Sequence, residues 1–184
     1  KQLVTVAWRI NRDSRPIFGY AADVSPNPEA AAPEVWSGVA TNYRFSVERD
    51  LPYLVWRFRD HPHHEYRFIN LRRDGTLLAF AVVRIVKEPF PLGVVSDFIV
   101  DPRQRELVNA LLGHVLGYFR TSGVTAVHLD LPTALAQDIV DRYPCSLSDP
   151  LNMISYSAND ALLAAGVQHP DTWFVARSDS DQDY

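Results

Sequence analysis

Two apolar runs joined by an Asp-Gly turn constrain the fold of this chain more than any other feature. The runs are Tyr66–Leu71 and Leu77–Val86, both rich in β-branched, aromatic and leucine residues, and Arg72-Arg73-Asp74-Gly75 separates them. Asp-Gly favours a tight hairpin because glycine accepts a positive φ without steric cost. The pattern therefore predicts a β-hairpin, followed by a third strand over Gly93–Val100.

Helical patterns lie on both sides of these strands. Asp101-Pro102 predicts the start of the longest helix, with Asp101 as N-cap and Pro102 in the first turn, and Ser122-Gly123 predicts its end. The other predicted elements are a short strand within Leu3–Ile10, a helix from Pro33, a helix from Arg49 to Asp60, a strand over Val124–Leu131, a helix over Thr133–Tyr143, and strands near Met153–Ser157 and Thr172–Ala176. This order predicts a mixed α/β domain with a mostly antiparallel central sheet flanked by helices.

The predicted organisation is one domain with two flanking segments. Prolines interrupt the stretch before residue 34, so residues 1–33 are predicted to be an N-terminal arm or linker. Residues 34–177 form the domain, and residues 178–184 are predicted to be a solvated acidic tail. Because the chain begins with Lys1, we expect it to be a piece of a longer protein.

Composition excludes several classes of function. Of 184 residues, 47% are apolar and 22% are charged, with a net charge of −4, which argues against nucleic-acid binding. The longest apolar run contains Arg84 and is half the ~20 residues that a membrane-spanning helix needs. The single cysteine, Cys145, fits a reducing compartment, and we expect a cytoplasmic protein. The chain has no Gly-x-Ser-x-Gly elbow, Walker loop or dinucleotide-binding fingerprint.

The strand Val95-Ser96-Asp97-Phe98-Ile99-Val100-Asp101-Pro102, with its following helix, resembles the GNAT acyltransferase superfamily. A second likeness is the run Glu48-Arg49-Asp50-Leu51-Pro52-Tyr53-Leu54-Val55-Trp56-Arg57-Phe58, which is similar to GNAT-like proteins of bacterial surface-polysaccharide gene clusters. The ending Asp171-Thr172-Trp173-Phe174 is similar to theirs as well, and some of these proteins have two GNAT halves. The resemblance therefore implies the C-terminal half of such a protein.

The resemblance implies a binding site for acetyl-CoA or another acyl-CoA. It places the acyl-CoA thioester beside Phe98, Ile99 and Val100, and the pyrophosphate at Arg103, Gln104 and Arg105. Asp97 is the candidate general base, and Tyr143 lies near the position of the family's tyrosine acid. On strand alternation, Asp97, Ile99 and Asp101 share one face, and Phe98 and Val100 share the other.

Two departures from the family pattern keep a second interpretation open. The pyrophosphate loop contains no glycine, and Asp101 as an N-cap would take N–H donors that the anion needs.

The first interpretation is an acyltransferase that acts on a small-molecule amine, with an amino sugar as one candidate. The alternative is a non-catalytic module that supports a second GNAT-like domain or a second copy of the chain, with Ala110, Gly113 and Gly117 as a docking face. An open gap between the third strand and Val124–Leu131 would favour catalysis, and a gap filled by side chains would favour the module.

Two candidate metal sites are weighed and rejected. His61, His63 and His64 could ligate zinc, but the sequence offers no second ligand cluster at a suitable spacing. Asp179, Asp181 and Asp183 alternate as in a calcium loop but lack its glycine and closing glutamate. We therefore predict no metal.

Overall fold

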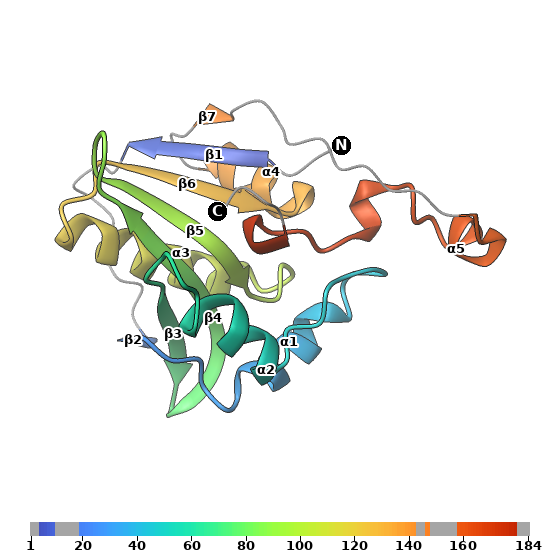
Figure 1. Cartoon of the computed structure of the whole chain (residues 1–184), viewed down its shortest axis with the longest axis horizontal. Coiled ribbons are helices and arrows are strands. Elements are labelled where there is room, and N and C mark those ends of the chain that lie inside the picture. Colours follow the sequence, from blue (N-terminus) through green and yellow to red (C-terminus); the bar gives the residue numbers. More distant parts are fainter. Residues whose placement is uncertain (1–3, 10–18, 143–145, 148–157, 180–184) are drawn as a thin grey trace.

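A seven-stranded mixed sheet organises the chain in the computed structural model, which describes residues 4–9, 19–142, 146–147 and 158–179 (Figure 1). The strand order is β2-β3-β4-β5-β6-β1-β7, and all neighbours pair antiparallel except β5 and β6. The strands are β1 (Val4–Arg9), β2 (Ala21–Ser25), β3 (Arg67–Arg73), β4 (Thr76–Val86), β5 (Leu92–Ile99), β6 (Ala126–Leu131) and β7 (Ser146–Leu147). The predicted mixed α/β fold with a mostly antiparallel sheet is confirmed.

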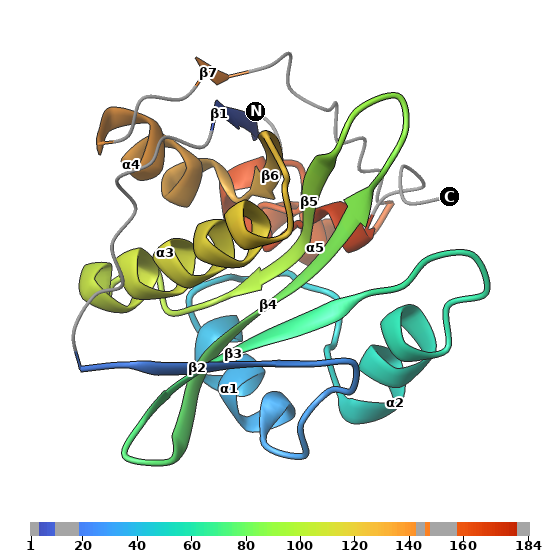
Figure 2. The same ribbon diagram turned by 90° about the vertical axis from the view of Figure 1, so that its left-hand side faces the viewer.

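Helices cover both faces of this sheet (Figure 2). The helices and helical turns of the described residues are α1 (Ala32–Ala40), α2 (Leu51–Leu54) continuing into the π-helical turn η1 (Val55–Arg59), α3 (Arg105–Thr121), α4 (Thr133–Arg142), α5 (Asp160–Ala164), and the 3₁₀ turns η2 (Pro170–Thr172) and η3 (Arg177–Asp179). α5 lies away from the sheet (Figure 1) and buries none of its residues. α3 and α4 bury their apolar sides against one face in a cluster that includes Val95 and Phe98. α1 and η1 pack on the other face, where Trp36 and Phe58 meet Ile99. The predicted alternation of Phe98 and Ile99 is thus confirmed.

The Asp-Gly hairpin forms as predicted. Asp74 and Gly75 have φ values of 51° and 81°, so the two residues between β3 and β4 lie in the left-handed region. Such turns match the twist of the flanking strands, and glycine adopts them without strain. The hairpin fixes the register of β3 and β4, and β4 in turn pairs with the central strand β5.

The segment predicted as an arm contributes two strands to the sheet. β1 pairs with β6 from Val4↔Leu131 to Arg9↔Ala126, and β2 pairs with β3. The prolines that suggested a linker all follow β2 or lie outside the described residues, so they do not interrupt these strands. The boundary at residue 33 therefore does not separate an arm from the sheet.

The C-terminal predictions need correction. Thr172–Ala176 is not a strand, since its pairing is an isolated bridge between Phe45 and Trp173, and Phe174 instead turns into the core against Trp36. Met153–Ser157 lies outside the described residues. The helix that was predicted to begin at Pro102, with Asp101 as its N-cap, begins at Arg105 with Gln104 as its N-cap. In the described part of the chain, no helix is both long and apolar enough to cross a membrane.

Candidate active site

The candidate site lies where β5 and β6 stop pairing. Their parallel register runs from Leu92↔Ala126 to Val95↔Leu129, although β5 continues to Ile99. At the same point the register between β4 and β5 shifts, because Val82 pairs with Asp97 and Val83 pairs with Val95. Ser96 is therefore the extra residue of a β-bulge. Bulges re-aim side chains and end strand pairing, and here the bulge sets Asp97 beside the divergence of the two strands.

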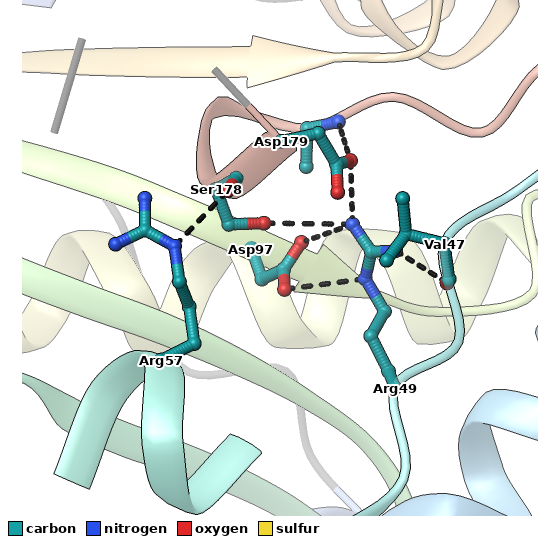
Figure 3. Close-up of polar contacts among 7 residues, drawn as sticks. Val47, Arg49, Arg57, Asp97, Ser178 and Asp179 are labelled. Atoms are coloured by element: carbon teal, nitrogen blue, oxygen red, sulfur yellow. Dashed lines mark hydrogen bonds and ion pairs between the residues drawn. The ribbon is translucent and has the colours of Figure 1, made fainter. Parts of the chain in front are cut away.

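Asp97 is fully buried and paired with Arg49 (Figure 3). Arg49 Nε donates to Asp97 Oδ2 at 3.3 Å, and Arg49 Nη2 lies 3.3 Å from Asp97 Oδ1. Both side chains have 0% exposure. Because a buried carboxylate is costly without a cation and hydrogen bonds, this pairing explains how Asp97 is accommodated at the end of the sheet.

Aromatic rings and a backbone carbonyl hold Arg49 in place. The centre of its guanidinium lies 4.7 Å from the ring centroids of both Trp36 and Phe174, and Arg49 Nη1 donates to the Val47 carbonyl at 2.7 Å. Trp36 comes from α1, whereas Phe174 comes from the C-terminal segment. No role was predicted for Arg49, because its partners are distant along the chain and only the fold brings them together.

The C-terminal turn η3 completes this cluster. Asp179 Oδ2 accepts hydrogen bonds from Arg49 Nη2 at 2.6 Å and from the Ala176 backbone N–H at 2.9 Å. Arg57 Nε donates to the Ser178 carbonyl at 3.1 Å. Ser178 is 6% exposed, so the predicted solvated tail is wrong for Ser178 and Asp179, which pack beside Asp97 (Figure 3).

A second ion pair ties η3 to the end of β6. Arg177 Nη1 lies 2.7 Å from Asp130 Oδ2, and the Asp130 side chain is fully buried. η3 thus contacts Asp97 on β5 through Arg49 and contacts Asp130 on β6 directly. The strands diverge here, but the C-terminal segment lies against the divergence and its side chains occupy the space beside Asp97.

Burial changes the proton affinity of the paired groups. It raises the pKa of Asp97 to about 6, against the lowering effect of the nearby Arg49 guanidinium. Burial alone would lower the pKa of Arg49, but Asp97 and Asp179 outweigh it and raise that pKa above its usual value. Arg49 is therefore a permanent cation, and Asp97 is the group in this pair that can change its charge near neutral pH.

The predicted phosphate-binding residues lie at the start of α3 and are paired with acids. Asp101 is not the N-cap: its carboxylate accepts from the Arg103 backbone N–H and from Arg103 Nε, both at 3.0 Å. Arg105 lies 3.1 Å from Asp138 of α4, and Gln104 is the N-cap without a side-chain acceptor. The prediction that Asp101 consumes the helical N–H donors is thus wrong, because the helix begins three residues later than expected.

The other predicted site residues are placed as follows. Phe98, Ile99 and Val100 are buried with their side chains in the core, so contact with a ligand there would come from their backbone. Tyr143 and Cys145 lie outside the described residues. The roles given to Asp97 and to the α3 residues stay predictions.

The histidine cluster forms a local loop contact. His61 Nδ1 accepts from the backbone N–H groups of His63 and His64 at 3.2 Å and 3.1 Å. Among the described residues, no group of three or more histidine, cysteine or acidic side chains is placed to hold a metal ion. The cluster therefore shapes the turn that leads into β3.

Comparisons with solved structures identify this architecture. A GCN5-related N-acetyltransferase from Anabaena variabilis aligns over 81% of this chain with a TM-score of 0.58 at 10% identity. The chain has the GNAT fold. A probable N-acyltransferase from Enterococcus faecalis aligns over 80% of the chain with a TM-score of 0.53 at 13% identity. A soil-metagenome aminoglycoside acetyltransferase, solved with sisomicin, aligns over 77% with a TM-score of 0.53 at 9% identity.

The share of each neighbour that is covered differs. This GNAT-fold chain spans 39% of the Anabaena protein and 38% of the Enterococcus protein, but 97% of the aminoglycoside acetyltransferase. No protein-family model and no curated protein sequence matches the chain. These likenesses establish the GNAT fold, and the chemistry of the site has to be argued from its own residues.

Proposed function

We propose that this chain is an N-acyltransferase-type domain that binds acyl-CoA where β5 and β6 diverge. The observation that carries the proposal is the end of β5–β6 pairing at Val95↔Leu129, next to the bulge that places Asp97. In the reaction, an amine nitrogen attacks the thioester carbonyl, a C–N bond forms and the C–S bond breaks. The amine loses a proton, and the departing thiolate takes one up.

Asp97 is the proposed acceptor of the amine proton, directly or through water. Burial raises its pKa to about 6, which brings its basicity close to the neutral pH at which a general base is most effective. Arg49 positions the carboxylate and keeps it partly ionised. Tyr143 as the proton donor to the thiolate remains part of this proposal.

The phosphates of CoA are proposed to lie at the start of α3. No side chain caps this helix, so the backbone N–H groups of its first turn support anion binding there. Arg103 and Arg105 would have to exchange their partners, Asp101 and Asp138, for phosphate. Both arginine side chains are exposed, at 69% and 74%, so the exchange needs little reorganisation.

The contacts of η3 do not fit a bound thioester beside Asp97. The proposal therefore includes a step in which Arg177–Asp179 moves away from the ends of β5 and β6 before acyl-CoA binds. The side chains of Arg177 and Asp179 hold η3 in place through polar contacts, so a single substitution at either residue can weaken its attachment.

The test is calorimetric titration of the chain with acetyl-CoA and with free CoA. We expect micromolar to millimolar binding that weakens at least tenfold in the Arg103→Ala/Arg105→Ala variant and strengthens in Asp179→Ala. Arg59→Ala is the matched control, since Arg59 pairs only with exposed Asp60 among the described contacts. No binding up to millimolar concentrations by either the native chain or Asp179→Ala would refute the proposal.

A small-molecule amine is the proposed acceptor, with amino sugars as the first class to screen. The fold likeness to an aminoglycoside acetyltransferase over nearly its whole length supports that choice. A cytoplasmic location, where acyl-CoA is available, belongs to the same proposal. Release of free thiol from acetyl-CoA in the presence of amino sugars measures the activity directly.

A specific observation favours a second candidate, a non-catalytic module. The side chains of η3 fill the space beside Asp97, and this is what a scaffold half would retain. Its partner would be a second GNAT-like domain or a second copy of the chain. Ala110 cannot contribute to the docking face, because it is fully buried in the chain's own core. Absence of CoA binding together with a concentration-dependent dimer would support this alternative.

A further inference from the structure

A cavity lies at the opposite end of the sheet from Asp97. It has a volume of about 530 Å³ and is formed where β4 ends, β5 begins and α3 terminates. Ten residues line it: His63, His64, Glu65, Arg67, Arg84, Ile85, Lys87, Pro91, Tyr118 and Ser122. The β4–β5 connection beside it is at the left of Figure 1, away from η3. None of these residues belongs to the candidate active site.

The lining of this cavity has the opposite charge from the whole chain. Arg67, Arg84 and Lys87 supply three cations and Glu65 supplies one anion, whereas the chain carries a net charge of −4. The Glu65 side chain is 88% exposed and lies 3.3 Å from Arg67 Nη2, at the solvent end of the site. A concave surface with an excess of one charge concentrates ligands of the opposite charge.

Polar and apolar groups accompany the cations. The two histidines, Tyr118 and Ser122 add hydrogen-bonding groups, and Ile85 and Pro91 add apolar surface. Arginine is suited to phosphate because its planar fork can donate two parallel hydrogen bonds to it. The volume lies in the range typical of small-molecule sites and exceeds what an inorganic anion would fill.

We propose that this cavity binds a small organic phosphate, with the phosphate held by Arg67, Arg84 and Lys87 and the organic part against Tyr118 and Ile85. The site is independent of the proposed acyltransferase site, because the two lie at opposite ends of β5. A phosphorylated ligand at this end would contact β3, β4 and α3 together, and would therefore stabilise the sheet that carries Asp97.

The experiment uses glucose 1-phosphate and inorganic phosphate as probes, in calorimetric titrations of the intact chain at fixed ionic strength. We expect glucose 1-phosphate to bind more tightly than inorganic phosphate, and glucose alone not to bind. Arg67→Gln and Lys87→Gln should each weaken binding about tenfold, since each removes a charge-assisted contact. Arg73→Gln is the matched control: Arg73 ends the same strand that Arg67 begins, and it pairs with Glu106 outside the cavity.

The outcomes separate this site from general charge attraction and from the CoA site. Equal weakening by Arg73→Gln and Arg67→Gln would overturn the proposal, as would the absence of binding at millimolar concentrations. Loss of glucose 1-phosphate binding in Arg103→Ala/Arg105→Ala would place the phosphate at α3 instead and would also overturn it. If glucose 1-phosphate binding is retained in Arg103→Ala/Arg105→Ala and lost in Arg67→Gln, the proposed site is supported, whether or not acyl-CoA binds. Thermal unfolding of each variant shows that it is folded.

Discussion

Arg49 and Asp97 form a two-point ion pair with no exposed surface, joining the loop before α2 to the bulged end of β5. Such pairs add little net stability when they form, but breaking one leaves an uncompensated buried charge. Arg49 also contacts Trp36, Phe174, Asp179 and the Val47 carbonyl. It is therefore the side chain that connects α1, β5 and the C-terminal segment.

Replacing Arg49 should cost far more stability than replacing an exposed arginine. We expect Arg49→Met to lower the free energy of unfolding by about 3–5 kcal/mol, because Asp97 loses its partner inside the core. Guanidinium denaturation measures the change. Arg59→Ala, which breaks an exposed pair with Asp60, should change stability by less than about 1 kcal/mol. The double variant Arg49→Met/Asp97→Leu should recover part of the loss, and strict additivity of the two single changes would contradict this account.

The stability of the chain should depend on pH through Asp97. Its pKa in the folded state is raised from 3.8 to about 6, so between these values the folded chain holds a proton that the unfolded chain releases. The free energy of unfolding that Asp97 contributes is therefore greatest below about pH 4 and falls as the pH rises to 6, by about 1.4 kcal/mol per unit of pKa shift.

The Asp97→Asn variant isolates this effect. Asparagine does not titrate, so the native chain should lose stability relative to Asp97→Asn as the pH rises from 4 to 6, in denaturation experiments at matched salt. A native chain that instead gains stability relative to the variant over this range would show that Arg49 holds the pKa of Asp97 below 3.8.

Gly93 should tolerate no larger residue. A Cβ at this position would lie 2.8 Å from two carbon atoms of the Phe119 ring, and that ring is fully buried against β5. We expect Gly93→Ala to destabilise the chain by about 1–3 kcal/mol through overpacking. Gly117→Ala is the control, since nothing lies within 4 Å of its Cβ position in α3 and alanine favours helix by roughly 1 kcal/mol. Thermal unfolding should therefore move in opposite directions for the two variants.

Local sequence patterns predicted the parts of the fold that depend on neighbouring residues. Asp74-Gly75 specifies its own turn because both residues adopt positive φ, and the apolar stripe from Leu107 to Phe119 specifies the buried side of α3. The predicted start of α3 was wrong because Asp101 forms a hydrogen-bonded turn with Arg103 and Gln104 before the helix begins. Asp101 can either cap a helix that starts at Pro102 or close a turn with Arg103 and Gln104. The local sequence fits both structures and does not distinguish them.

The candidate site depended on contacts that no local pattern contains. Arg49 is separated from Asp97 by 48 residues and from Asp179 by 130. The bulge at Ser96 is set by the pairing of β5 with β4, and the pairing of β1 with β6 joins residues 4–9 to residues 126–131. No local signal marks Arg49, since it lies between Glu48 and Asp50 in a charged stretch that is equally compatible with an exposed arginine.

Closure of the site beside Asp97 should depend on Asp179. Asp179 Oδ2 accepts from both Arg49 and the Ala176 backbone, so Asp179→Ala removes two hydrogen bonds that hold η3 while leaving the Arg49–Asp97 pair in place. Carbodiimide coupling to an amine, followed by mass spectrometry, reports which carboxylates solvent reaches. We expect Asp97 to be unmodified in the native chain and modified in Asp179→Ala. Asp179→Asn retains an acceptor oxygen and should stay closer to the native chain. If Asp97 stays unmodified in Asp179→Ala, the ion pair of Arg177 with Asp130 is sufficient to hold the segment, and access to Asp97 requires that contact to break as well.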